Sequence, residues 1–116
     1  MSFDAKLASR LEKMMTKDLK TPGLSESRMM GGFGYMMNGN MCLGIHRNTL
    51  IIRIGVDTVK AVLQEPYVRP MDLTGKVMRG WATLEPRAIE KDEDLKRYCK
   101  YVINFVKTLP KKSGKH

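Results

Sequence analysis

The sequence predicts a single α+β domain, a two-layer sandwich in which helices pack on one face of an antiparallel sheet. Three observations indicate this architecture: an apolar stripe at helical spacing near the N-terminus, a central run of short alternating segments joined by tight turns, and a long amphipathic segment near the C-terminus. Short connections favour antiparallel pairing of the strands, and helices segregated from the strands favour two layers.

The first predicted element is an amphipathic helix that ends before residue 21. Ser2 suits the N-cap and Asp4 the first turn, because the first backbone N–H groups of a helix need acceptors and favour negative charge. Thr21-Pro22-Gly23 ends the region, since proline cannot continue a helix and glycine permits a turn. The apolar stripe that we expect to be buried comprises Phe3, Leu7, Leu11, Met14 and Met15.

A meander of strands is predicted next. Residues 25–29 form a weak first strand, and the alternation of Phe33, Tyr35 and Met37 with other residues indicates a second. Asn38-Gly39 fits a type I′ hairpin turn, because both residues tolerate a positive φ angle.

The return strand of this hairpin should span residues 41–46, with a second turn at Arg47-Asn48. In the strand that follows, alternate side chains must point to opposite faces. One face of it is predicted to carry Leu50, Ile52 and Ile54, and the other Ile51 and Arg53.

The next predicted segments are a short helix and another strand. Either Gly55 or Asp57 can cap the helix, and Glu65-Pro66 stops it. Residues 67–75 are irregular or briefly extended, and alternation from Met78 to Leu84 indicates a strand.

The clearest predicted element is the last helix, which follows a break and a possible helical turn at Pro86. Its acidic start (Asp92, Glu93 and Asp94) and its later lysines complement the helix dipole, and Pro110 ends it. Its buried stripe is predicted to comprise Leu95, Tyr98, Cys99, Val102, Val106 and Leu109, widened by Tyr101 and Phe105.

Length and composition limit the classes of protein that fit. The 116 residues suit one domain, which we place at residues 1–110 with a basic tail at residues 111–116. No apolar run is long enough to cross a membrane and the first ten residues do not resemble a signal peptide, so we expect a cytoplasmic protein.

The two cysteines and the net charge each allow two interpretations. For Cys42 and Cys99 the sequence favours free, buried thiols, and a disulfide between them is the alternative. The net charge of +9 fits solubility and attraction to phosphate equally well.

Four segments together resemble one known family. RMMGGFGYMMNGNM, LIIRIG, VRPMDLTGKVMRGW and the closing LPKK resemble the N-terminal domain of the TfoX (Sxy) competence regulators, over residues 3–111. The resemblance implies an α+β fold that often forms dimers, kinship with regulators of DNA uptake that act with a cyclic-AMP receptor-type transcription factor, and no catalytic residues. Competence regulators of the family also carry a C-terminal domain, and the N-terminal domain occurs alone as a small protein as well. The positions that match the family pattern are Arg28, Gly31, Gly32, Asn38, Gly39, Pro70, Met71, Gly75, Met78 and Gly80.

The residues themselves offer no catalytic, metal or cofactor site that we would expect to function. Cys42 and His46 share a strand face in the predicted alternation but lie about 13 Å apart, too far for a hydrogen-bonded dyad. The clustered carboxylates Asp92, Glu93 and Asp94 are explained by a helix start, and the cysteines and histidines lack zinc-site spacing. We therefore expect no enzyme, no metal and no cofactor.

A binding role remains, with two candidate surfaces. Five of the ten methionines lie between residues 29 and 41, and flexible, polarizable methionines suit adaptable partner surfaces. Arg79 shares a face with Trp81 in the predicted strand and can stack on it. We therefore expect a protein partner, one in the transcription machinery, at Arg28, Met29, Met36, Arg79 and Trp81. The alternative is weak, salt-sensitive nucleic-acid binding through Lys96, Lys100, Lys107 and Lys111, predicted to lie along one side of the last helix.

Overall fold

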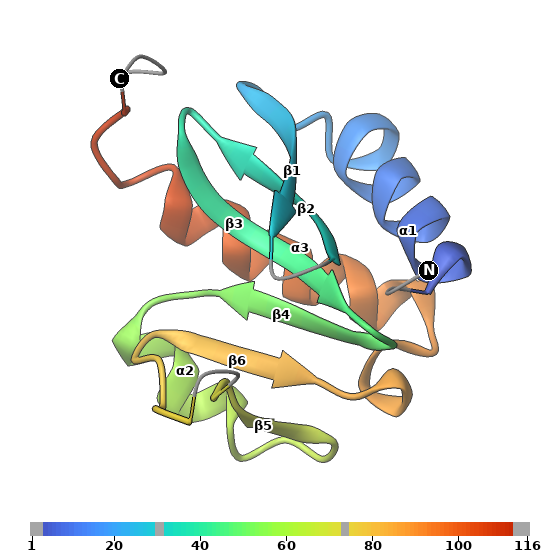
Figure 1. The fold of residues 1–116 in the computed structure, drawn as a ribbon, viewed down its shortest axis with the longest axis vertical. Helices are drawn as coiled ribbons and strands as arrows, with labels where there is room; N and C mark the ends of the chain where they lie inside the picture. Colours follow the sequence, from blue (N-terminus) through green and yellow to red (C-terminus); the bar gives the residue numbers. More distant parts are fainter. Residues whose placement is uncertain (1–3, 30–31, 73–74, 113–116) are drawn as a thin grey trace.

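The computed structural model describes residues 4–29, 32–72 and 75–112 and has the predicted α+β architecture (Figure 1). The described elements follow one another in this order: α1 (Ala5–Glu12), the π-helix η1 (Lys13–Asp18), β1 (Leu24–Met29), β2 (Gly32–Met37), β3 (Asn40–His46), β4 (Thr49–Arg53), α2 (Val56–Val62), β5 (Val68–Pro70), β6 (Trp81–Leu84), the 3₁₀-helix η2 (Pro86–Ile89) and α3 (Asp92–Val106).

The strands form one six-stranded sheet in the order β1-β2-β3-β4-β6-β5. Every neighbouring pair is antiparallel. The order is sequential until β4, after which β6 lies between β4 and β5. In Figure 1, α3 passes behind β3 and α1 lies beside the β1–β2 end, so the helices cover one face of the sheet. The opposite face is called the outer face below.

The N-cap of the first helix lies two residues later than the sequence predicted. Asp4 is the N-cap, and its carboxylate accepts hydrogen bonds from the backbone N–H groups of Lys6 at 2.9 Å and Leu7 at 3.1 Å. The predicted cap Ser2 and the stripe residue Phe3 lie outside the described residues. The helix widens into η1, where the adjacent residues Met14 and Met15 are both buried.

The predicted turns agree with the structure. Asn38 and Gly39 have φ angles of 52° and 83°, as a type I′ turn requires. Arg47, in the second predicted turn, has a φ of 59°. Gly55 is the N-cap of α2, with a φ of 88°, and Asp57 occupies the first turn instead.

Two predicted boundaries are wrong. Strand β6 begins at Trp81 instead of Met78, because Gly80 has a φ of 84°, which an extended strand does not allow. Helix α3 ends at Val106, well before Pro110, so Lys111 does not lie on the helix.

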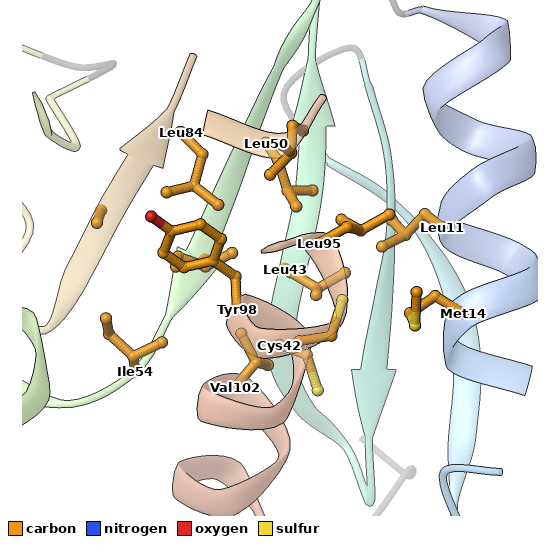
Figure 2. Close-up of a cluster of buried hydrophobic side chains, with 14 of the residues drawn as sticks. Leu11, Met14, Cys42, Leu43, Leu50, Ile54, Leu84, Leu95, Tyr98 and Val102 are labelled. Carbon is orange, nitrogen blue, oxygen red and sulfur yellow. The ribbon is translucent and has the colours of Figure 1, made fainter. Parts of the chain in front are cut away.

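The core lies between the sheet and the helices. Figure 2 shows Leu95, Tyr98 and Val102 of α3 pointing toward Leu43 and Leu50 of the sheet. Cys42 and Cys99 are free and fully buried in this layer, as the sequence favoured. Among the described residues, no helix has both the length and the apolar character that crossing a bilayer requires.

Candidate partner interface on the outer sheet face

The middle of the outer face has a low floor made by glycines. Register places Gly34, Gly44, Ile51 and Thr83 in one row across β2, β3, β4 and β6. These side-chain positions alternate with residues of the helix-side core, so the row points outward. A Cβ on Gly34 would come within 2.3 Å of the Leu43 carbonyl oxygen, so this close strand approach requires glycine.

An apolar cavity of about 80 Å³ lies on this floor. Met71 and Met78 meet beside this cavity, since the N–H of Met78 donates to the carbonyl of Met71 at 2.8 Å. Met71 is buried, whereas Met78 and its neighbour Val77 are 39% and 63% exposed. The cavity is lined by Met41, Gly44, Ile45, His46, Ile51, Met71, Met78 and Trp81.

Arg53 supplies the cation at one end of this face. Its guanidinium lies 5.8 Å from the ring centroid of Trp81 and 6.0 Å from that of Phe105. Its Nη1 also donates to the Met41 carbonyl at 3.3 Å. Sequence reasoning paired Trp81 with Arg79, but Arg79 precedes β6 and is exposed. The observed pair arises because Arg53 and Trp81 are directly opposite on neighbouring strands.

The residues predicted for partner binding do not form one cluster. Met36 pairs with Met41, and it lies with Trp81 on the outer face. Arg28 pairs with Phe33, which packs against the helix-side core, so Arg28 lies on the other side of the sheet. Met29 is the last residue of β1, opposite Gly32. The predicted partner site omitted Ile51, Arg53 and Met71. Two signals pointed to them: the alternation that placed Ile51 and Arg53 on one strand face, and the family pattern that included Met71.

A bulge separates the two residues that were considered as a catalytic pair. The β2–β3 register shifts between Tyr35 and Met36, so Cys42 joins the helix-side core while His46 lines the outer cavity. The prediction that Cys42 and His46 share a face is therefore wrong. Burial raises the pKa of the Cys42 and Cys99 thiols to about 12. The described residues contain no group of three or more His, Cys, Asp or Glu arranged to hold a metal ion.

The basic residues of α3 form a separate surface. Lys96 and Lys100 are exposed beside a shallow groove with Tyr101 and Asn104, and Lys107 follows at the C-cap. None of these three lysines forms an ion pair with another described residue. Lys111 follows Pro110 and is not part of this helix surface.

The neighbouring Arg97 is held by Glu65, in the turn that follows α2. It makes two hydrogen bonds of 3.0 Å to the Glu65 carboxylate, which also accepts one from Tyr98 Oη at 2.5 Å. The bonds from Arg97, more than those from Tyr98, lower the pKa of Glu65 despite its partial burial. Burial, followed by Glu65, raises the pKa of Tyr98 to about 12. This network ties the end of α2 to α3 and leaves Arg97 unavailable as a free cation.

Comparison with known proteins identifies the family. The family description that matches is the TfoX N-terminal domain, over residues 19–106, which is more than half of the chain and includes the sheet and α3. No curated protein and no solved structure matches the chain. The chain belongs to the TfoX N-terminal domain family and is a TfoX-like regulatory module.

Proposed function

We propose that this regulatory module acts through protein–protein contacts, and that its outer sheet face binds one apolar side chain of the partner. The observation that carries the proposal is the apolar cavity of about 80 Å³ beside the exposed Met78. Its volume suits a single aliphatic side chain, since one water occupies about 30 Å³ in the liquid. A partner in the transcription machinery, as the resemblance to competence regulators implies, is the expected setting.

The charge around the cavity favours a partner with acidic residues next to its apolar one. Lys76 and Arg79 are exposed on the segment that carries Met78, and neither forms an ion pair with a described residue. Arg53 likewise forms no ion pair with a described residue. Asp72 is the acid on this segment, so cations predominate. Opposite charges at the rim would speed association and fix orientation, while the buried apolar contact supplies affinity.

Structural roles account for the altered pKa values of Glu65 and of the two thiols. The shifted carboxyl of Glu65 belongs to an ion pair that joins two helices, and the shifted thiols are enclosed in the core. Methionine side chains at the cavity can adjust to an incoming group. We therefore propose a module without enzymatic activity of its own.

Selection from a displayed peptide library tests this proposal. Bound peptides should carry a Leu, Ile, Met or Phe between Asp or Glu residues. Met78→Asp should weaken the best peptide at least about tenfold, because it places a charge where the apolar side chain enters. Val56→Asp is the matched control, since Val56 is also 39% exposed but does not line the cavity. Equal binding to both variants, or selection without acidic residues, would contradict the proposal.

Nucleic-acid binding is the second candidate, supported by the exposed and unpaired lysines of α3. Lys96, Lys100 and Lys107 could contact phosphates without reading bases, which gives weak and salt-sensitive binding. Fluorescence anisotropy with labelled duplex and single-stranded DNA, at low and physiological salt, tests it. Binding that survives physiological salt and weakens in the triple alanine variant would favour this function over the protein partner. Loss of binding on adding salt would assign the lysines to solubility.

A further inference from the structure

A polar groove of about 410 Å³ lies where η1 leads into β1 (Figure 1). Register places Glu26 of β1 directly opposite Tyr35 of β2, so both side chains lie on the helix-side face of the sheet. No residue lines both this groove and the outer-face cavity, so the two are separate sites. The groove is lined by Thr16, Thr21, Gly23, Leu24, Ser25, Glu26 and Tyr35.

Two hydroxyl groups of this groove are buried without hydrogen-bond partners. Tyr35 is only 2% exposed, and neither its Oη nor the Oγ1 of Thr21 has a hydrogen-bond partner among the described residues. A buried hydroxyl that has given up water and gained no partner destabilises the folded state, so most such groups in proteins are paired. A ligand that bonds to both oxygens would satisfy them.

Two carboxylates determine the charge of a ligand that fits. A hydroxyl both donates and accepts, so the two hydroxyls alone would suit a cation or an anion. Glu26 lines the groove, and Glu12 lies one helical turn before Thr16, whose hydroxyl donates to the Glu12 carbonyl at 2.7 Å. Burial, followed by the charges of Glu26 and Glu12, raises the pKa of Tyr35 to about 12. Neither carboxylate forms an ion pair with a described residue, so the groove attracts cations and repels anions.

We propose that this groove binds a guanidinium group, the cation of an arginine side chain, with Glu26 as its counter-ion and the oxygens of Tyr35 and Thr21 as further acceptors. A guanidinium carries five N–H donors in one plane, so it can bond to a carboxylate and to hydroxyls at the same time. An alkylammonium has three donors and is more strongly hydrated, so it should bind more weakly. Arg28 lies on the same strand face two residues from Glu26, and it forms no ion pair with a described residue.

Titration of the ¹⁵N-labelled protein with ethylguanidinium chloride at constant ionic strength, followed by NMR, tests the proposal. Amide signals of residues 16–26 and 35 should shift and saturate with a dissociation constant of about 1–10 mM, as expected for so small a ligand. Ethylammonium should bind at least about fivefold more weakly. The peptide Gly-Arg-Gly with blocked ends distinguishes two sources of the group. Tighter binding than ethylguanidinium indicates an arginine of a protein partner, and equal or weaker binding indicates a free guanidinium compound.

Three substitutions locate the site. Glu26→Gln should weaken ethylguanidinium binding at least about fivefold, because a charge-assisted hydrogen bond is lost. Glu90→Gln is the matched control, since it removes the same charge at an exposed residue outside the groove, and it should change the dissociation constant less than about twofold. Tyr35→Phe keeps the ring and removes the unpartnered hydroxyl. It should weaken binding about threefold or more while the urea midpoint of unfolding stays the same or rises, which a merely structural hydroxyl would not do.

The outer-face cavity plays no part in this binding. Met78→Asp should therefore bind ethylguanidinium like the wild type, whether or not the cavity binds a partner. Absence of saturable shifts, equal binding of ethylguanidinium and ethylammonium, or wild-type binding by both Glu26→Gln and Tyr35→Phe would overturn the proposal.

Discussion

The guanidinium of Arg53 lies 5.8 Å from the ring centroid of Trp81 and joins the end of β4 to the start of β6. The same side chain donates to the Met41 carbonyl, so it also holds the start of the neighbouring strand β3. Arg53 therefore organises one wall of the outer-face cavity, to which both Met41 and Trp81 contribute.

Replacing Arg53 with alanine should lower the free energy of unfolding by about 1–2 kcal/mol, since a cation–π contact and a hydrogen bond are lost together. Arg79→Ala, at an exposed cation of the adjacent segment, should change it by less than about 0.5 kcal/mol. Urea unfolding followed by the fluorescence of the single tryptophan measures both values. The folded emission of Arg53→Ala should also differ from the wild type. Equal effects of the two substitutions would mean that Arg53 does not hold Trp81.

The glycine floor of the outer face gives a second prediction. Gly34→Ala should cost more than about 2 kcal/mol, because the new Cβ would overlap the Leu43 carbonyl and the Gly44 Cα, both backbone atoms that cannot move aside cheaply. Gly75→Ala is the control: its φ of 82° costs a non-glycine residue about 1 kcal/mol, but no atom lies within 4 Å of the new Cβ. Chemical denaturation should rank Gly34→Ala as clearly the more damaging. The reverse ranking would contradict the close approach of β2 to β3.

The parts of the fold that the sequence predicted correctly depend on local chemistry. The apolar period gives the buried stripe of α3, and Asn38-Gly39 gives the β2–β3 turn because both residues tolerate a positive φ. The resemblance to the TfoX family was likewise carried by short segments in order. These signals need no knowledge of which elements meet in space.

The errors came from features set by distant parts of the chain. The bulge opposite Tyr35 moves Cys42 to the helix-side core, and simple alternation along β3 cannot reveal it. The placement of β6 between β4 and β5 brings Trp81 to Arg53, whereas sequence proximity suggested Arg79. The candidate cavity depends on this topology and on the meeting of Met71 and Met78, so only its methionine and tryptophan character could be foreseen.

The two thiols should be unreactive in the folded protein. Cys42 and Cys99 are fully buried, and burial raises the pKa of each thiol to about 12, so the reactive thiolate is scarce near neutral pH. A thiol reagent at pH 8 should modify less than one cysteine per chain until denaturant is added, and then both. Folding raises the pKa of each thiol from 9.0 to about 12. The contribution of the thiols to the free energy of unfolding is therefore fully present below pH 9.0 and is lost as the pH rises toward 12. Rapid modification without denaturant would contradict the packing of α3 on β3.

The ion pair between Glu65 and Arg97 should make stability depend on pH in the acid range. Because the folded state lowers the pKa of Glu65 below 4.5, its contribution is present above pH 4.5 and is lost as the pH falls through the folded value. The two side chains are 29% and 40% exposed, so solvent weakens the pair, and Glu65→Gln should cost about 1 kcal/mol at pH 7. Urea unfolding of both proteins at pH 7, 4.5 and 3 isolates this effect, since the other carboxyl groups titrate alike in each. The difference between wild type and variant should shrink as the pH falls. A constant difference at all three values would mean that the Gln substitution acts through packing against Tyr98 and that the charge of Glu65 contributes nothing.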